Sequence, residues 1–451
     1  LNLVFANYFS IKYIFLHSVE SRMGQKTILA IIPLILSIGI IPSLSFYEVD
    51  AEPTQICIDK VWMENIRGKI ACVTPSTADK LVERGWGTIL ADDVFDKKPK
   101  MFEPGMKQEA IDYDKELSLL PEHFGGVGPM TVTPFIGELT KSYPEFYVPG
   151  TEELDENEMR IYACGTGSPW IVESQSASCF LIQTGAGHNL LFEIGGGSIG
   201  NLNALGLAAD ELTDIFVSHL HVDHIGDFDM FWGQGFMWGR TIPVTLHGPS
   251  GPTTELGTEY FAEHFLETWT WDLESKRGTA NSAWHKINVN QFAYSEKNQV
   301  VYEKNGLTVT AFPAVHGIDG AVSYRIDWNE MSVVYSGDTV VNKYILENSK
   351  DVDVLILQVF PSAEIISKMY NVSLELAEFL LEHAHISPEG AGVLLQLTQP
   401  RVPLIFHMNL FEPEIVPDAI SIIREYYDKP LAVAQDLTTV NLTPDYAIIR
   451  Q

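Results

Sequence analysis

The stretch SHLHVDHIGD, residues 218–227, brings three histidines and two aspartates together. Imidazole and carboxylate groups are ligands that suit zinc, and also iron or manganese. Alternate residues of an extended loop point the same way, so His219 and His221 can bind one ion. Asp223 and His224 then turn toward a neighbouring position. The spacing predicts one half of a metal centre.

Three more ligand-type residues follow other apolar segments. His316 comes after an alternating segment that begins at an Asn-Gly turn, Asp338 follows MSVVY, and His407 follows VPLIF. The candidate metal ligands are therefore His219, His221, Asp223, His224, His316, Asp338 and His407. They are too many for one tetrahedral ion, but they suffice for two ions that share a carboxylate and a water. Such a pair makes hydroxide available near neutral pH, so the expected chemistry is hydrolysis.

Short strands must position these residues. The apolar run 215–217 directly before the first cluster is typical of a strand that is buried on both faces. Residues 159–164 form another predicted strand, which ends in the glycine-rich loop GTGSP. That loop lacks the rest of a nucleotide-binding fingerprint, so it predicts a tight turn. Four strands are thus expected to present a ligand just past their ends.

From about Glu156 to the C-terminus, the pattern H-x-H-x-D-H followed by His, Asp and His resembles the metallo-β-lactamase superfamily. The resemblance implies an α+β fold, an αββα sandwich with two divalent metal ions at its edge: zinc first, with manganese or iron as alternatives. It also implies the roles of the ligands: His219, His221 and His316 for the first metal, Asp223, His224 and His407 for the second, and Asp338 as the bridge. Asp223 would also steer the attacking hydroxide. The family usually has Asp where this chain has Glu193, which leaves the role of Glu193 open.

The stretch EHAHISPEGAG places His385 before a helix whose start is indicated by Ser387 and Pro388. With ACGTGSP and VTLHGPSG, it resembles the ribonuclease Z and arylsulfatase-like branch of the superfamily. In that branch this histidine assists the leaving oxygen, which makes His385 the second candidate catalytic residue after Asp223. The alternative is a helix-capping or surface histidine.

The tRNA-processing members of this branch carry a His-Glu-Ala-Thr motif and a basic arm that grips RNA. Leu357 and Gln358 stand at the His and Glu positions here, and no basic arm is found. The chain has 59 acidic and 29 basic residues, a net charge of -30 that repels polyanions. A nucleic-acid partner is therefore not expected.

The segment 228–286 is aromatic and acidic. Its aromatic residues either line a mouth that accepts an apolar group or pack in the core: Phe231, Trp232, Phe236 and Trp238. Arg240 either binds a sulfate or phosphate oxygen or forms a surface salt bridge. His247 and His383 are expected to be structural.

The remaining chain predicts export. Residues 1–22 are interpreted as an upstream extension, and residues 23–51 as a signal peptide cut near Ala51 or, alternatively, as a membrane anchor. The expected domains after it are a small module over 52–105 with Cys57 and Cys72, a linker or wrapping segment over 106–155, and the hydrolase domain over 156–451. A disulfide would help to stabilise so small a module. Cys164 and Cys179 either pair or remain buried thiols.

The sequence thus predicts an exported, extracytoplasmic dinuclear hydrolase, secreted or membrane-anchored. Its expected substrate is a small ester, a sulfate ester or phosphodiester first, which a metal-bound hydroxide attacks. The alternatives are a ribonuclease Z-type tRNA 3′ endonuclease, a lactonase with the same ligands, and a cell-surface interaction protein with a vestigial hydrolase domain. A complete ligand set argues against the last of these. Any membrane contact would go through the N-terminal anchor, and a homo-oligomer is compatible with the sequence.

Overall fold

The computed structural model describes residues 61–65, 70–73, 78–80, 82, 87–89, 134–143, 148–278 and 283–450. The predicted signal or anchor segment, residues 23–51, lies outside the described residues, and so do Cys57 and residues 106–133. Within the described ranges, no helix is both long enough and apolar enough to cross a membrane.

A small antiparallel sheet has the strand order β2-β1-β3, with β1 at Val61–Asn65, β2 at Ile70–Val73 and β3 at Gly87–Ile89. In its register Trp62 pairs with Cys72, and Met63 pairs with Ile89. These strands fall within residues 52–105, where the sequence predicts a small module.

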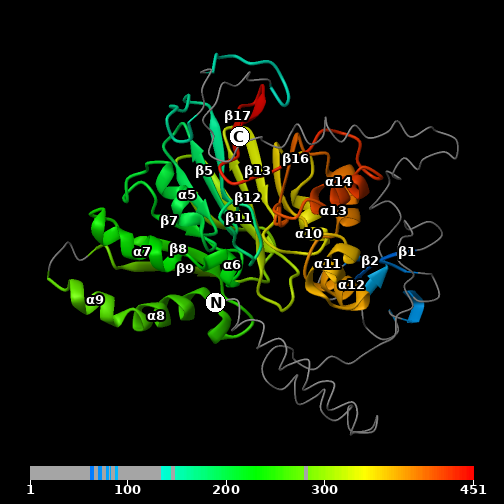
Figure 1. The fold of residues 1–451 in the computed structure, drawn as a ribbon, viewed down its shortest axis with the longest axis horizontal. Coiled ribbons are helices and arrows are strands. Elements are labelled where there is room, and N and C mark those ends of the chain that lie inside the picture. Colours follow the sequence, from blue (N-terminus) through cyan, green and yellow to red (C-terminus); the bar gives the residue numbers. More distant parts are fainter. Residues whose placement is uncertain are drawn as a thin grey trace, which may run out of the picture. The chain divides into compact units, whose positions relative to one another are not determined.

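An eight-stranded sheet carries the first part of the main domain, in the order β18-β17-β4-β5-β6-β7-β8-β9 (Figure 1). Its strands are β4 Met159–Gly165, β5 Cys179–Thr184, β6 Asn189–Phe192, β7 Asp214–Phe216, β8 Val244–Pro249, β9 Ile287–Phe292, β17 Thr439–Leu442 and β18 Ala447–Arg450. The strands from β6 to β9 pair in parallel, so each connection must cross over the sheet. Helices make these crossovers: α5 Ser198–Ala204, α6 Val222–Ile225, α7 Phe228–Met237, α8 Thr258–Thr268 and α9 Thr270–Lys276.

A seven-stranded sheet carries the second part, in the order β10-β11-β12-β13-β14-β15-β16. Its strands are β10 Gln299–Lys304, β11 Leu307–Pro313, β12 Val322–Trp328, β13 Met331–Tyr335, β14 Val354–Gln358, β15 Val402–Phe406 and β16 Ala432–Val433. Its helices are α10 Lys343–Asn348, α11 Ala363–Tyr370, α12 Leu374–His383, α13 Pro388–Thr398 and α14 Ile415–Ile423. Asn305 and Gly306 join β10 to β11 with φ of 46° and 78°, which confirms the predicted Asn-Gly turn.

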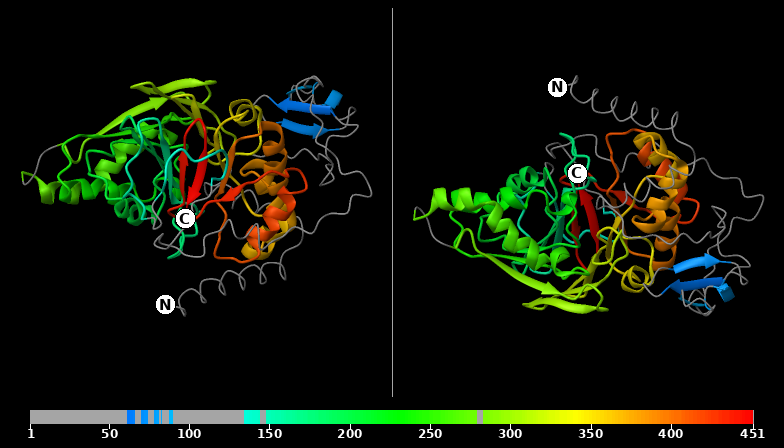
Figure 2. Two further views of the ribbon diagram at one scale, coloured as in Figure 1. Left: turned by 90° about the horizontal axis from the view of Figure 1, so that it is seen from above. Right: turned by 90° about the horizontal axis from the view of Figure 1, so that it is seen from below.

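The two sheets pack face to face through a buried apolar core. Phe180 of one sheet and Phe406 of the other lie in this core with ring centroids 5.0 Å apart. A second apolar cluster lies between the first sheet and helices α5, α7 and α8, and a third between the second sheet and α10, α13 and α14. Figure 2 shows helices on both sides of the paired sheets. The predicted αββα sandwich is confirmed.

A disulfide joins Cys164 and Cys179 across the neighbouring strands β4 and β5, with their Cα atoms 4.9 Å apart. Of the two alternatives for these cysteines, pairing is therefore correct, and they are not buried thiols. The loop that the disulfide closes, residues 165–178, is also held by the Asp436 carboxylate. Asp436 accepts hydrogen bonds from the backbone N–H groups of Thr166 and Ser176, at 3.1 and 2.7 Å. The glycine-rich loop is therefore fixed at both of its ends.

The described part of the predicted linker, residues 134–143 and 148–155, contacts the first sheet. Ile136 forms a β-bridge with Ala447 of β18. Lys141 forms an ion pair with the fully buried Glu158, just before β4.

Candidate metal centre

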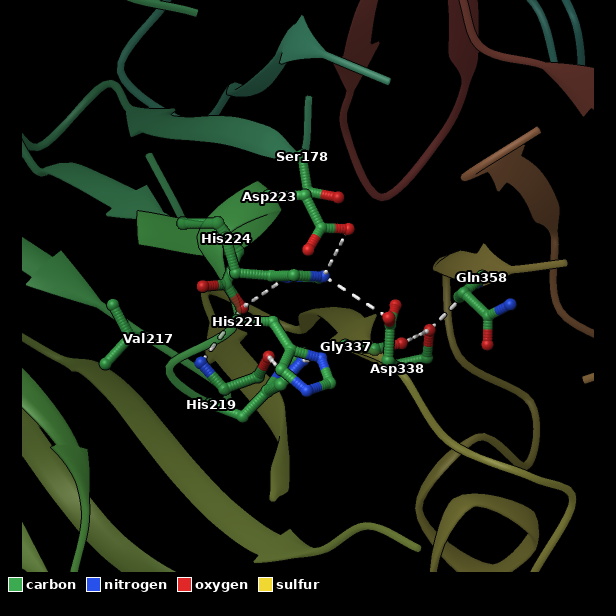
Figure 3. A network of polar contacts seen from close by, with 12 residues as sticks. Ser178, Val217, His219, His221, Asp223, His224, Gly337, Asp338 and Gln358 are labelled. Carbon is green, nitrogen blue, oxygen red and sulfur yellow. Dashed lines mark hydrogen bonds and ion pairs between the residues drawn. The ribbon is translucent and has the colours of Figure 1, made fainter. Parts of the chain in front are cut away.

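The first four candidate ligands come from one short stretch after β7. His219 and His221 lie in the extended segment, and His221 is the residue from which α6 starts. Asp223 and His224 lie on the first turn of α6, so their side chains point to a different side from those of His219 and His221 (Figure 3). The predicted change of direction within H-x-H-x-D-H thus has a helix start as its cause.

The other three candidates follow β11, β13 and β15, as expected. His407 comes directly after β15 with φ of 76°, a left-handed backbone that a non-glycine residue rarely adopts. Its backbone N–H donates to the Thr166 carbonyl at 2.7 Å, which holds it there. Backbone strain at a residue like this is typical of functional sites.

Three imidazoles form the first ligand group. His221 Nδ1 lies 3.0 Å from His219 Nε2 and 3.0 Å from His316 Nε2. A tetrahedral zinc ion holds its ligand nitrogens roughly 3.3 Å apart, so this convergence fits one ion. Behind them, Ser218 Oγ lies 2.9 Å from His219 Nδ1, and the Ala384 carbonyl accepts from His316 Nδ1 at 2.6 Å. These contacts turn the Nε2 atoms of both rings inward.

Burial also prepares these rings for a cation. It lowers the pKa of His219 well below its usual value and the pKa of His316 to about 4. Burial lowers the pKa of His221 as well. All three are therefore neutral near pH 7, with lone pairs available for a metal.

Asp223, His224, Asp338 and His407 form the second ligand group. Asp338 Oδ2 lies 3.3 Å from His224 Nε2, 3.4 Å from His407 Nε2 and 3.8 Å from His316 Nε2. Asp338 thus reaches both groups, which is the place expected of a bridging carboxylate.

The electrostatics of the second group fit divalent cations. Burial opposes the charge of His224, but Asp338 and Asp223 outweigh it and raise the pKa of His224 well above its usual value. Burial likewise opposes ionisation of Asp338, but His407 and His224 outweigh it and lower the pKa of Asp338. Among the described residues, Asp338 Oδ1 and both ring nitrogens of His224 find no hydrogen-bond partner, although they are buried. Unsatisfied buried polar atoms are costly, and a cation between the carboxylates would satisfy them.

His385 lies beside the two groups. Its Nδ1 is 3.8 Å from Asp338 Oδ2, and its ring stacks on Phe360 with centroids 4.3 Å apart and planes at 11°. The helix-capping alternative is wrong, because Ser387 caps α13 by accepting a hydrogen bond from the Gly390 N–H at 3.1 Å. This confirms the predicted helix start and leaves His385 facing the site.

Two buried residues support the centre from behind. Glu193 Oε1 accepts from the Ser218 N–H at 2.9 Å and lies 3.6 Å from His224 Nδ1. Gln358 accepts through Oε1 from the backbone N–H groups of Ile386, at 3.3 Å, and Thr339, at 3.5 Å. Gln358 therefore connects the segments that carry His385 and Asp338, a role that the sequence did not suggest.

The centre opens into a cavity of about 650 Å³. The lining residues are Ser168, Pro169, Trp170, Ile171, His221, Asp223, His316, Asp338, Phe360, Tyr370, His385 and His407. The loop after β4 and the end of α11 thus form a wall of the cavity that carries none of the candidate ligands. The one sequence signal for this wall was the GTGSP loop, which directly precedes Trp170.

The aromatic segment does not supply this wall. Phe231 and Trp232 are buried in the apolar cluster under α7, so the core-packing alternative holds for both. Arg240 is 2% exposed and donates to the carbonyls of Phe231 and Trp232 at 3.3 and 3.4 Å. Both alternatives for Arg240 are therefore wrong, and burial lowers its pKa to about 10.

The two histidines expected to be structural lie outside both ligand groups. His247 stacks on Phe216 within the first sheet, with centroids 4.3 Å apart, and lies 3.0 Å from Asp214 Oδ1. His383, the last residue of α12, places its Nδ1 2.9 Å from the Phe379 carbonyl.

Comparison with known proteins places this site in a family. Residues 200–408 match the family described as "Beta-lactamase superfamily domain". This region is a metallo-β-lactamase superfamily domain. The match includes all seven candidate ligands and His385.

Among curated relatives, ribonuclease Z of Mycobacterium avium is 26% identical over 199 residues, which are 40% of this chain and 63% of that protein. The anti-Pycsar protein Apyc1 of Bacillus phage 010DV004 is 26% identical over 200 residues, which are 42% of this chain and 72% of that protein. The chain thus spans less than two thirds of the ribonuclease Z that it matches.

Among solved structures, a metallo-β-lactamase fold protein of Bacillus subtilis is 15% identical, with a TM-score of 0.46 over 63% of this chain and 100% of that one. The short form of human tRNase Z is 18% identical, with a TM-score of 0.45 over 62% of this chain and 98% of that one.

Proposed function

We propose that this protein is a metal-dependent hydrolase that cleaves a small phosphodiester or sulfate ester. The observation that carries the proposal is the convergence of two ligand groups on Asp338, with His385 beside them in the lining of a cavity. A purely structural cluster would have no need of buried, unsatisfied carboxylate and imidazole atoms that face a cavity.

One divalent ion would be held by His219, His221 and His316. A second would be held by Asp223, His224 and His407. Asp338 would bind both ions. Imidazole-rich ligand sets favour zinc, with manganese and iron as alternatives. Divalent ions in such a site make water acidic enough to lose a proton near neutral pH and stabilise charge on the reacting oxygens.

The remaining steps belong to the protein. The carboxylate of Asp223 accepts a hydrogen bond from the attacking water and orients it toward the scissile group. Burial lowers the pKa of His385, so its neutral ring donates one N–H hydrogen bond to the leaving oxygen. Phe360 fixes the plane of that ring by stacking on it.

The similarity to proteins named ribonuclease Z supports phosphodiester chemistry and makes a ribonuclease Z-type endonuclease the second candidate. A net charge of -30 and the absence of the His-Glu-Ala-Thr motif favour a small substrate over RNA. A lactone remains a further candidate, because it would need only the same metal ligands.

We also propose that the protein is exported. The Cys164–Cys179 disulfide supports this, because disulfides persist in oxidising compartments and are rare in the cytosol of mesophiles.

The test is a hydrolysis panel on the full chain reconstituted with zinc or manganese. It contains an aryl sulfate, an aryl phosphodiester, a simple aryl ester, a lactone and a tRNA precursor. Asp223→Ala and His385→Ala are compared with His383→Ala, a nearby histidine whose ring lies outside both ligand groups.

We expect turnover of the phosphodiester or the sulfate, at least a hundredfold loss in the Asp223 and His385 variants, and wild-type rates for His383→Ala. Cleavage of the tRNA precursor alone would favour the second candidate. Preference for the lactone without dependence on His385 would mean that the metal site is right and the substrate wrong.

A further inference from the structure

We infer that the substrate carries an uncharged aromatic group, and that Trp170 and Tyr370 bind this group while the ester faces the metal ligands. The inference rests on the proposed function and names the substrate class that the same cavity would take. Its basis is the wall formed by the loop after β4 and the end of α11, whose residues differ in chemistry from the metal ligands that line the same cavity.

That wall is aromatic and open to a ligand. Trp170 is 53% exposed and Tyr370 is 37% exposed, although both line the cavity. The ring centroids of Trp170 and Tyr370 are 6.4 Å apart, with the ring planes tilted by 43°. The centroids of Trp170 and Phe411 are 6.2 Å apart, with the planes tilted by 51°. These separations are at the long end of the range for aromatic pairs, so the Trp170 ring keeps surface free for another ring.

The wall is also held in place before any ligand binds. Trp170 lies on the loop that the Cys164–Cys179 disulfide closes. Buried Asn409 connects the two halves of the wall, since it accepts from Ser168 Oγ at 2.6 Å and donates to the Tyr370 hydroxyl at 3.4 Å. A preorganised aromatic surface loses little conformational entropy on binding, which favours affinity.

The charges of the lining disfavour a polyanion. Among the residues that the structure describes, none that lines the cavity is Lys or Arg. A second phosphate beyond the scissile group would therefore meet no counter-charge on this wall, in a protein whose net charge is -30. An uncharged ring, either an aryl group or a nucleobase without further phosphates, satisfies both the aromatic and the charge constraint.

The experiment measures binding, not turnover. Isothermal titration of the zinc-loaded full chain compares phenylphosphonate with methylphosphonate, because the two share an anionic group and differ in the ring. The variants are Trp170→Ala, Trp170→Phe and, as the matched control, Trp271→Ala, since Trp271 is 80% exposed on α9 and does not line the cavity.

We expect the wild type to bind phenylphosphonate about tenfold more tightly than methylphosphonate. Trp170→Ala should abolish this preference, Trp170→Phe should retain most of it, and Trp271→Ala should leave it unchanged. Equal binding of the two probes by the wild type, or a preference that survives in Trp170→Ala, overturns the inference even if the enzyme hydrolyses esters. Failure to bind either probe, together with no turnover in the panel above, overturns the proposed function and the inference with it.

Discussion

The fully buried carboxylate of Glu193 lies 3.6 Å from Nδ1 of His224, while Nε2 of the same ring faces Asp338 at 3.3 Å. The carboxylate is thus placed to hold the ring so that one nitrogen points into the ligand group. Residues behind metal-binding histidines set their tautomer and orientation in this way.

The first prediction concerns this contact. Glu193→Gln keeps the size of the side chain and its acceptor for the Ser218 N–H, but removes the ionisable carboxyl group beside His224. We expect metal affinity to fall by about 10–100-fold. Competition with a chromophoric chelator measures this, and Glu156→Gln at an exposed position is the control. Equal zinc affinity in both variants would show that Glu193 does not orient His224.

The second prediction concerns metal removal. Within the described part of the chain, Asp338 Oδ1 and both ring nitrogens of His224 are buried without hydrogen-bond partners, so a bound cation should stabilise the folded state. At a free zinc concentration a hundred times Kd, binding contributes about 2.7 kcal/mol, and we expect Tm to rise by roughly 4 °C for a domain of this size. Differential scanning fluorimetry with and without chelator measures the shift. Asp338→Asn should lose most of it, and an equal shift in that variant would place the zinc elsewhere.

The ligand set was predictable because each member follows a recognisable strand or lies in one local motif. His219 to His224 needed only six consecutive residues after β7, and His316, Asp338 and His407 each follow an apolar run. The αββα sandwich came from resemblance, because strand order depends on pairings between distant segments. The parallel pairing of β14 with β13 and β15 cannot be predicted from the residues within each strand.

The cavity wall was not predictable for the same reason. Trp170 and Tyr370 lie 200 residues apart in the chain and meet only through the fold. By contrast, the spacing of Phe231 and Trp232 is equally compatible with core packing, and their burial decides for the core. A run of aromatic residues in a sequence therefore does not indicate which of them face a ligand.

The third prediction concerns the disulfide. The double variant Cys164→Ala/Cys179→Ala removes the disulfide that closes the loop carrying Trp170. A disulfide that closes a loop of about this length contributes about 3 kcal/mol to the free energy of unfolding. We expect the free energy of unfolding to fall by about that amount and phenylphosphonate binding to weaken. Urea denaturation of wild type and variant under the same non-reducing conditions measures the first effect, and titration measures the second. An unchanged midpoint would mean that Asp436 alone holds the loop.

The fourth prediction concerns Arg240, whose guanidinium is buried against the ring of Phe231 and donates to the carbonyls of Phe231 and Trp232. Arg240→Met retains an unbranched side chain but leaves both carbonyls without this donor, so we expect the free energy of unfolding to fall by about 1–3 kcal/mol. Because Arg240 does not line the cavity, kcat/KM for an anionic ester should stay within about twofold of wild type. Denaturation and steady-state kinetics on the same preparation separate the two effects, and His385→Ala provides the opposite pattern, with low kcat/KM and wild-type stability. A fall in kcat/KM for Arg240→Met at unchanged stability would instead mean that this guanidinium contacts the substrate during turnover.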